Sequence, residues 1–182
     1  DEKRKKIKGV VITHGHEDHV GAISHLLNEV NVPIYGTPLT LGFVGVKLAK
    51  RGMSKDIKLI EIKAGESVDI GEFNVEFCHV CHSVPDGAAL GITTPVGLVV
   101  HSGDYKFDHT PVDNWPTDFA KLAEWAGRGV LALLSDSTNA DKPGWTPSER
   151  VIDSALDDVF READGRIIIA SFASLISRIQ QV

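Results

Sequence analysis

The chain opens with short apolar runs that alternate with stretches of helical spacing. Residues 7–13 are almost continuously apolar, which predicts a buried strand. Residues 18–30 place apolar side chains three and four positions apart, which predicts a helix. A short strand is expected at 33–36, followed by a helix that Thr37 caps and that ends before Gly52.

The middle of the chain is richer in strands, and its last third returns to alternating strands and helices. Turn signals separate expected strands at 57–62, 68–70, 73–80, 89–93 and 98–101. Further on, the pattern predicts helices at 118–126, at 147–163 with Thr146 as cap, and from 173 onward. Buried strands are expected at 130–134 and 166–170. This order of elements indicates a layered α/β architecture.

A dense cluster of polar side chains follows the first apolar run. His14, His16, Asp18 and His19 are four potential metal ligands within six residues. Imidazole nitrogens and carboxylates suit zinc. One short segment cannot wrap four donors around a single ion without strain, so we expect His14 and His16 to serve one metal, and Asp18 and His19 a second. The alternative is a solvated loop that happens to be rich in histidine.

Two more polar residues stand at the ends of expected strands. His82 follows the strand at 73–80, and Asp104 follows the strand at 98–101. Strand ends can present ligands from a rigid sheet into a common cleft, and Gly103 lets the backbone turn so that the Asp104 carboxylate points back toward the metals. A carboxylate between two cations can bridge them, and the water or hydroxide held there becomes a nucleophile at neutral pH.

Composition narrows the class of protein without fixing its partner. With 182 residues, 42% hydrophobic and 24% charged, the chain is typical of a soluble globular protein of one domain or slightly more. It has no apolar stretch near the roughly 18 residues of a membrane span. Two cysteines favour a reducing cytoplasm over a disulfide framework. The net charge of -6 argues against a broadly basic nucleic-acid surface, but RNA stays possible through zinc ions and a local basic patch.

The remaining histidines and cysteines are weaker candidates. His79 lies three residues before His82 in the same expected strand, so alternation points it to the other face. Cys78 and Cys81 have a spacing seen in redox and zinc sites, but their place on a strand favours packing. His101 is expected to be buried or to contact a metal ligand, and not to bind the metal itself.

The polar residues together resemble the metal motifs of the metallo-β-lactamase superfamily. Its His-x-His-x-Asp-His motif is matched at 14–19, its third-motif histidine by His82 and its bridging aspartate by Asp104. Further segments are similar to one branch, ribonuclease J in the β-CASP group, namely 82–86, 103–108, 134–140, 171–174 and 177–181. The similarity covers essentially the whole chain.

The resemblance implies a role for each matched residue. A first zinc would be held by His14, His16 and His82, and a second by Asp18 and His19, with Asp104 shared by both. Asp18 and Asp104 would be the catalytic carboxylates, with Asp18 orienting the nucleophile. Asp136 matches the acidic residue that opens the β-CASP motifs. The expected substrate-lining residues are Ser83, Asp86, Asp136 and Ser137. A helix-capping loop is the alternative for 135–139.

The resemblance also leads us to expect a fragment, truncated at both ends. Residues 1–140 would form a partial metallo-β-lactamase domain, the N-terminal half of an αββα sandwich, and 141–182 the incomplete beginning of a β-CASP domain. Since the branch takes a further histidine for the second zinc from a later segment, we expect that site to be the weaker one. Position 175 is Leu where the branch usually has Asn. An uncovered apolar face is expected to drive formation of a homo-oligomer or a domain-swapped dimer.

Three classes of function follow from these expectations. The first is a zinc-dependent hydrolase that cleaves RNA phosphodiester bonds, as a 5′-to-3′ exonuclease and an endonuclease, with a metal-bound hydroxide. The second is a hydrolase of small substrates, such as a lactone, a thioester or a β-lactam. The third is an inactive zinc-binding fragment.

Overall fold

The computed structural model describes residues 3–53 and 57–182, and in these it forms two β-sheets. The smaller sheet is parallel and has three strands, in the order β1 (Val10–Val11), β2 (Ile34–Gly36) and β3 (Leu59–Glu61). The larger sheet has five strands in sequence order, namely β4 (Ser67–Ile70), β5 (Phe73–His79), β6 (Ala88–Thr94), β7 (Gly97–His101) and β8 (Val130–Leu134). Its pairs are antiparallel up to β7, and β8 joins it in parallel.

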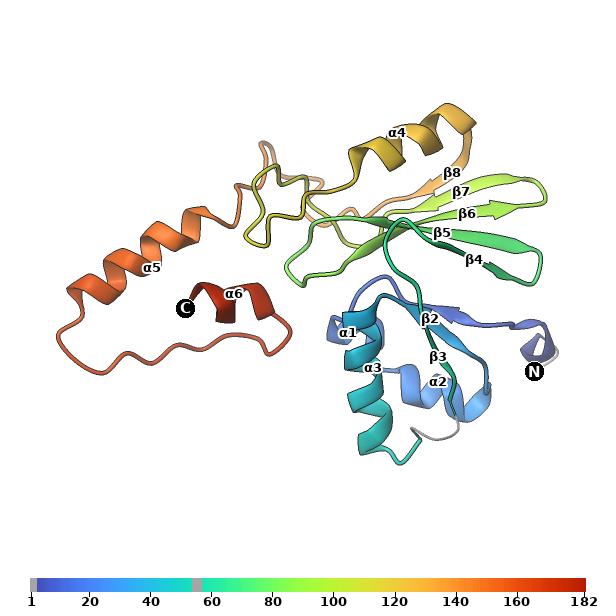
Figure 1. Cartoon of the computed structure of the whole chain (residues 1–182), viewed down its shortest axis with the longest axis horizontal. Helices are drawn as coiled ribbons and strands as arrows, with labels where there is room; N and C mark the ends of the chain where they lie inside the picture. Colours follow the sequence, from blue (N-terminus) through green and yellow to red (C-terminus); the bar gives the residue numbers. More distant parts are fainter. Residues whose placement is uncertain (1–2, 54–56) are drawn as a thin grey trace.

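The two sheets pack face to face and helices cover both outer faces (Figure 1). Helices α2 (Ile23–Glu29) and α3 (Pro38–Lys50) lie on the smaller sheet, and α4 (Phe119–Arg128) lies on the larger one. Three apolar clusters fill the spaces between these layers. Their central members are Leu27, Ile34 and Val44 under α2 and α3, Tyr35, Phe77 and Leu90 between the sheets, and Val80, Val100 and Trp125 under α4. The expected αββα layering is therefore present.

Most of the expected elements form close to their predicted bounds, because periodicity and turn residues agree there. The strand at 130–134 forms over the predicted residues, and the helix after Thr37 begins at Pro38. The expected helix at 18–30 is two shorter helices, α1 (Glu17–Val20) and α2, separated at Gly21. A side chain at Gly21 would meet the Glu17 carbonyl oxygen at 2.5 Å, so this close turn requires glycine.

Three expectations in the last third of the chain are wrong. Residues 166–170 form no strand, and Ile168 is 87% exposed; a strand needs a neighbour for its backbone hydrogen bonds, and none lies beside this segment in the described part of the chain. Strand β8 forms but is exposed along its length, since it is the edge of its sheet. Helix α5 (Val151–Glu162) begins after Arg150, so Thr146 is not its cap.

Tertiary contacts account for the later start of α5. The Glu149 backbone N–H donates to the carboxylate of Asp108, a residue of the distant loop after β7, at 3.1 Å. The Ser148 hydroxyl donates to the carbonyl of Thr110, in the same distant loop, at 2.9 Å. Helix α6 (Ile176–Gln181) likewise begins three residues later than expected. Local pattern alone does not contain these long-range partners.

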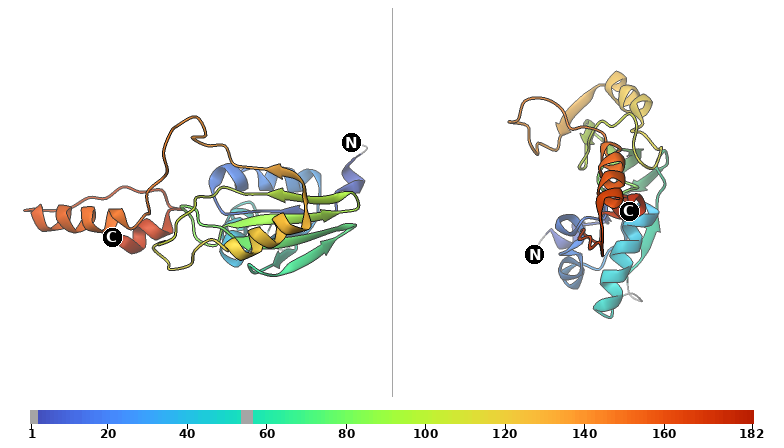
Figure 2. Two further views of the ribbon diagram at one scale, coloured as in Figure 1. Left: turned by 90° about the horizontal axis from the view of Figure 1, so that it is seen from above. Right: turned by 90° about the vertical axis from the view of Figure 1, so that its left-hand side faces the viewer.

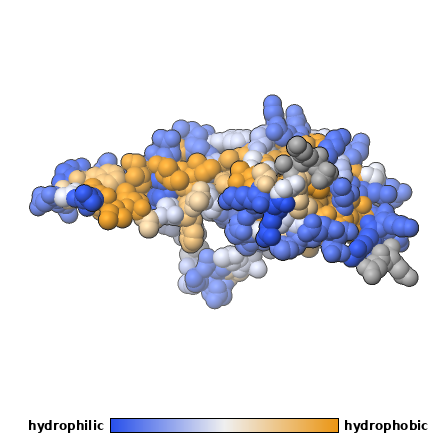
Figure 3. Space-filling model, turned by 90° about the horizontal axis from the view of Figure 1, so that it is seen from below, coloured by the Kyte–Doolittle hydropathy of each residue, from blue (hydrophilic) through white to orange (hydrophobic). Residues whose placement is uncertain are grey.

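The segment with α5 and α6 extends away from the sandwich (Figures 1 and 2). Apolar side chains gather on this extension in the view of Figure 3. Among its exposed residues are Val159, Ile168, Phe172 and Ile179. No helix in the described part of the chain has the length and apolar character of a membrane span.

Packing of α4 on its sheet yields a test of the fold. Trp125 is 1% exposed, and a Cβ added at Gly91 of β6 would lie 2.4 Å from its ring. We expect Gly91→Ala to lower the free energy of unfolding by about 1–3 kcal/mol through overpacking. The control is Gly127→Ala in α4, where a Cβ meets nothing within 4 Å and should raise it by about 0.5–1 kcal/mol. Urea denaturation measures both, and an unchanged stability of Gly91→Ala would contradict this packing.

Candidate metal centre

Loops from both sheets meet at one end of the sandwich and carry the predicted ligands. His14 and His16 lie between β1 and α1, and Asp18 and His19 lie on α1 itself. The Thr13 carbonyl at the start of this loop accepts the Ala88 N–H of β6 at 2.9 Å, which ties the loop to the larger sheet. His82 lies between β5 and β6 and Asp104 follows β7, so the larger sheet supplies both of them.

Four of these side chains form a first group. The potential ligand atoms of His14, His16, His82 and Asp104 all lie within 4.8 Å of one another. His82 Nε2 is 3.0 Å from His16 Nδ1. The Asp104 Oδ2 atom is 3.7 Å from His14 Nε2 and 3.8 Å from His82 Nε2. The chain thus brings together side chains separated by ninety positions of sequence.

A second group lies against the first and shares Asp104 with it. It consists of Asp18, His19 and Asp104. His19 Nε2 is 3.4 Å from Asp104 Oδ2 and 3.5 Å from Asp18 Oδ2. The Asp18 side chain is 76% exposed, whereas those of His19 and Asp104 are each 30% exposed. The second group is therefore the more open of the two.

Burial keeps the imidazoles of the first group in their neutral form. Burial, followed by repulsion from the neighbouring imidazoles, lowers the pKa of His14 to about 3. Burial also lowers the pKa of His16 and of His82, although the carboxylate of Asp104 acts against it in both. A neutral imidazole has a free lone pair on one ring nitrogen, which is the form that binds metals.

The residues fit a divalent metal by chemistry and by spacing. The Nε2 atom of His14 is buried and has no hydrogen-bond partner among the described residues, a costly state that a metal ion would relieve. With Zn–N bonds of about 2.0–2.1 Å, two tetrahedral ligands on one ion lie about 3.3 Å apart. The separations given above, from 3.0 to 3.8 Å, lie around this value.

The predicted substrate-lining residues fall into two pairs. The Ser83 hydroxyl lies 3.2 Å from His16 Nε2. The charge of Asp136 is near enough to oppose in part the lowering of the pKa of His14 and His82, which burial causes. Ser102 fixes Asp136, since its hydroxyl accepts the Asp136 N–H at 2.8 Å. These two residues border the first group.

The other pair is engaged elsewhere. The Asp86 carboxylate accepts the Leu39 N–H at the start of α3, at 3.0 Å, and the Asp86 carbonyl accepts the Thr37 hydroxyl. Its backbone has a positive φ of 68°. Ser137 lies in an exposed turn, where its carbonyl accepts the Ala140 N–H. The structure thus gives Asp86 a role at a helix terminus and leaves Ser137 on the surface.

The weaker candidates lie outside both groups. His79 is buried, stacks on Trp115 with 3.8 Å between ring centroids, and bonds the Trp115 carbonyl through Nε2. Cys78 and Cys81 are free and buried, and burial raises the pKa of both thiols, that of Cys78 to about 12. These residues pack the interior beside the site. His101 accepts the Gly103 N–H at 3.0 Å and so helps to shape the Asp104 turn.

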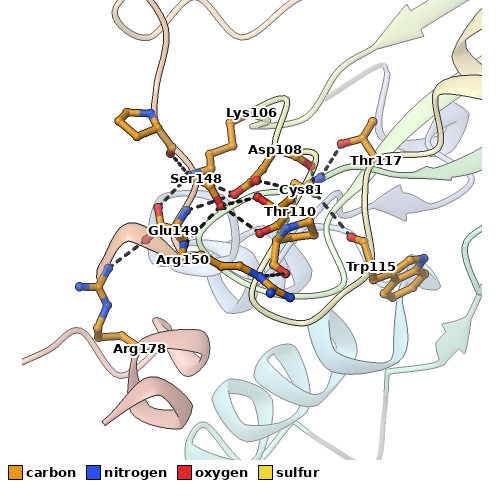
Figure 4. Close-up of polar contacts among 12 residues, drawn as sticks. Cys81, Lys106, Asp108, Thr110, Trp115, Thr117, Ser148, Glu149, Arg150 and Arg178 are labelled. Atoms are coloured by element: carbon orange, nitrogen blue, oxygen red, sulfur yellow. Dashed lines mark hydrogen bonds and ion pairs between the residues drawn. The ribbon is translucent and has the colours of Figure 1, made fainter. Parts of the chain in front are cut away.

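Sequence reasoning missed two features of the site. The first is the Thr13 hydroxyl, which lies 3.1 Å from His14 Nδ1. Its only signal in the sequence was a polar residue at the end of an apolar run. The second feature is a polar network around Asp108 and Glu149 (Figure 4). Lys106 Nζ donates to Glu149 at 2.9 Å, and so does Arg178 Nη2 of α6.

This network connects the loop after β7 to the extension. Asp108 accepts N–H groups from Thr110 and Glu149. Burial acts to raise the pKa of Asp108, but these hydrogen bonds outweigh it and hold the pKa below its usual value. A pocket beside the first ligand group is lined by His82 and Ser83 and also by Lys106 and Arg178.

Comparison with known proteins defines the class first. The sequence model described as "Metallo-beta-lactamase superfamily" matches residues 1–154. The chain therefore belongs to the metallo-beta-lactamase superfamily. A crystal structure of a protein of unknown function from Enterococcus faecalis V583 has the same fold, with a TM-score of 0.68 and 19% identity over 95% of this chain and 43% of that one.

Within the superfamily, the chain is similar to ribonuclease J proteins. It is 48% identical over 181 residues to Ribonuclease J of Helicobacter pylori strain J99, covering 98% of this chain and 26% of that protein. It is 41% identical to Ribonuclease J2 of Bacillus subtilis, covering 100% of this chain and 33% of the relative. The chain thus spans about a quarter to a third of the length of these relatives.

The shared carboxylate gives a direct test of the two ligand groups. We expect two zinc ions per chain, falling to about one in His82→Ala or His19→Ala, because each removes a ligand from one group only. Asp104→Ala should weaken both. Mass spectrometry of metal content after equilibration with Zn²⁺ measures this, with His25→Ala of α2 as the control that keeps both ions. If His25→Ala lost as much zinc as Asp104→Ala did, the assignment would be wrong.

Proposed function

We propose that this chain contributes the zinc centre of a hydrolase that cleaves RNA phosphodiester bonds. The observation that carries the proposal is the position of Asp104, which is a member of both ligand groups. A carboxylate shared by two adjacent sites is the arrangement of two-metal hydrolases. The similarity to proteins named ribonuclease J supports RNA as the substrate.

Different residues of the chain would bind the metal ions and orient the attacking water in such a site. Two divalent ions, when bound, supply Lewis-acid activation of water and of the scissile phosphate. His14, His16 and His82 would hold one ion through neutral imidazoles, and Asp104 would be a ligand at both positions. The carboxylate of Asp18, which is 76% exposed, would accept a hydrogen bond from the attacking water and orient it. Because the second group is the more open, we propose that its ion binds more weakly.

The pocket beside His82 is the proposed path of the RNA backbone. Lys106 and Arg178 line it. Both donate to Glu149, and we propose that their remaining N–H groups contact phosphate oxygens. Ser83 and Asp136 border the same region from the metal side. We propose both modes of cleavage expected from the family resemblance, 5′-to-3′ exonuclease and endonuclease, for the protein to which these residues belong.

The extension is proposed to be part of a second domain. We place the boundary near residue 140, so that 1–140 belong to the metallo-β-lactamase domain and 141–182 begin a β-CASP domain. Its support is the position of α5 and α6, which lie beyond the layers of the sandwich (Figure 1). The Asp108 and Glu149 network would then couple the two parts.

Cleavage assays test the substrate class. Zinc-loaded protein should shorten 5′-monophosphorylated RNA and leave a chromogenic β-lactam intact. Asp104→Ala should lower the rate of RNA cleavage by at least about 100-fold, since both metal positions lose a ligand. Hydrolysis of the β-lactam but not of RNA would favour a small-substrate hydrolase. Equal RNA cleavage by Asp104→Ala would reveal a contaminating nuclease.

Self-association through the extension is a separate prediction. Ile168 and Phe172 are 87% and 81% exposed, and exposed apolar side chains that gather on one part of a surface favour association. We expect sedimentation equilibrium to show dimers whose dissociation constant rises in the Ile168→Ser, Phe172→Ser double variant. Val96→Ser, in the exposed turn between β6 and β7, is the matched control. A monomer at high concentration would contradict the prediction.

A further inference from the structure

We propose that two hydroxyl groups, those of Thr13 and Ser83, set opposite tautomers in the two histidines of the His-x-His segment. In this arrangement His14 presents Nε2 to the first metal position and His16 presents Nδ1. Thr13 and Ser83 are then positioning residues that act through the histidines. The inference rests on the metal-binding part of the proposed function and deepens it.

The contact between Thr13 and His14 carries the first half of the proposal. Thr13 Oγ1 lies 3.1 Å from His14 Nδ1, and both residues are buried. A proton on Nδ1 donated to this oxygen leaves the lone pair on Nε2. That nitrogen is the buried atom that has no hydrogen-bond partner in the described residues, and it faces Asp104 Oδ2 at 3.7 Å. Both ring nitrogens are then accounted for.

Thr13 is itself held in place by contacts with the larger sheet. Its carbonyl accepts the Ala88 N–H at 2.9 Å. A Cβ built at Gly103 would lie 3.3 Å from the Thr13 Cβ, so the Asp104 turn closes against the threonine from the other side. The Thr13 hydroxyl is therefore fixed in place before any ion binds, and its hydrogen bond orients the His14 ring.

The contact between Ser83 and His16 supports the second half of the proposal, in which the proton is on the other ring nitrogen. Ser83 Oγ lies 3.2 Å from His16 Nε2. His16 Nδ1 lies 3.0 Å from His82 Nε2, an atom of the same ligand group. With the proton on Nε2 and donated to the serine, the Nδ1 lone pair of His16 points toward the position that His82 also faces.

Partners of this kind matter because they fix ring orientation and tautomer before the metal arrives. A histidine ligand ordinarily donates its second N–H to a carboxylate, a carbonyl or water, and loss of that partner costs about 10–100-fold in metal affinity. Here the acceptors are hydroxyl groups, so each can be removed by a substitution that barely changes side-chain volume.

Matched substitutions of Thr13 test the proposal by metal affinity. Chelator competition with Zn²⁺ alone should show a loss of about 10–100-fold in Thr13→Val and of less than about threefold in Thr13→Ser, which keeps the hydroxyl. Ser83→Ala should weaken binding in the same way, with Ser83→Thr as its hydroxyl-bearing control. Equal affinity of Thr13→Val and Thr13→Ser would overturn the role of Thr13.

A second readout does not require any metal to bind. Long-range ¹H–¹⁵N correlations in the metal-free protein should show the proton of His14 on Nδ1 and that of His16 on Nε2. In Thr13→Val the His14 proton should redistribute between its two nitrogens, while His16 keeps its tautomer. The same tautomer on both histidines of the natural protein would overturn the proposal. Correct tautomers without zinc binding would instead count against the proposed function alone.

Discussion

The close approach of the two sheets at Gly103 is the constraint on which the metal centre depends. Gly103 adopts a positive φ of 61°, and a Cβ there would lie 2.8 Å from the Ala88 carbonyl oxygen of the neighbouring strand and 3.3 Å from the Thr13 Cβ, in the loop after the smaller sheet's β1. Only glycine combines this backbone conformation with so short an approach. The turn places Asp104 beside the loop that carries the histidines, while Thr13 on the other side bonds Ala88. The ligands supplied by the two sheets therefore meet because two backbones touch.

Much of this arrangement could be predicted from local sequence. The strands from 68 to 101 follow the alternation of the chain and its turn residues, and the cluster at 14–19 has few other chemical uses. The pairing of His82 and Asp104 with that cluster came from their places after strands and from the family resemblance. The resemblance implied that Asp104 is shared, but neither source supplies distances. Coordinates were needed to place its carboxylate 3.4 Å from His19 Nε2 and 3.7 Å from His14 Nε2.

What could not be predicted depends on contacts between distant segments. Residues 166–170 have the composition of a strand, but composition does not say which strand lies beside them. The start of α5 is set by Asp108, about forty positions earlier, and the Asp86 carboxylate accepts the Leu39 N–H of the distant helix α3. The hydroxyl of Thr13 is equally invisible in sequence, since a threonine before a loop has no special signal. For α5 and Asp86 the deciding partner is remote in the chain, whereas for Thr13 it is the ring orientation of the adjacent His14.

The distribution of ligands along the chain has a thermodynamic consequence. The ligand atoms, which come from residues between 14 and 104, are brought together only when both sheets have formed. An unfolded chain therefore offers no comparable site. Binding energy for the ions is then also folding energy. A ligand at 100 times its dissociation constant adds about 2.7 kcal/mol to stability. The supply of the bound metal would accordingly help to set how much of this polypeptide is degraded by proteases.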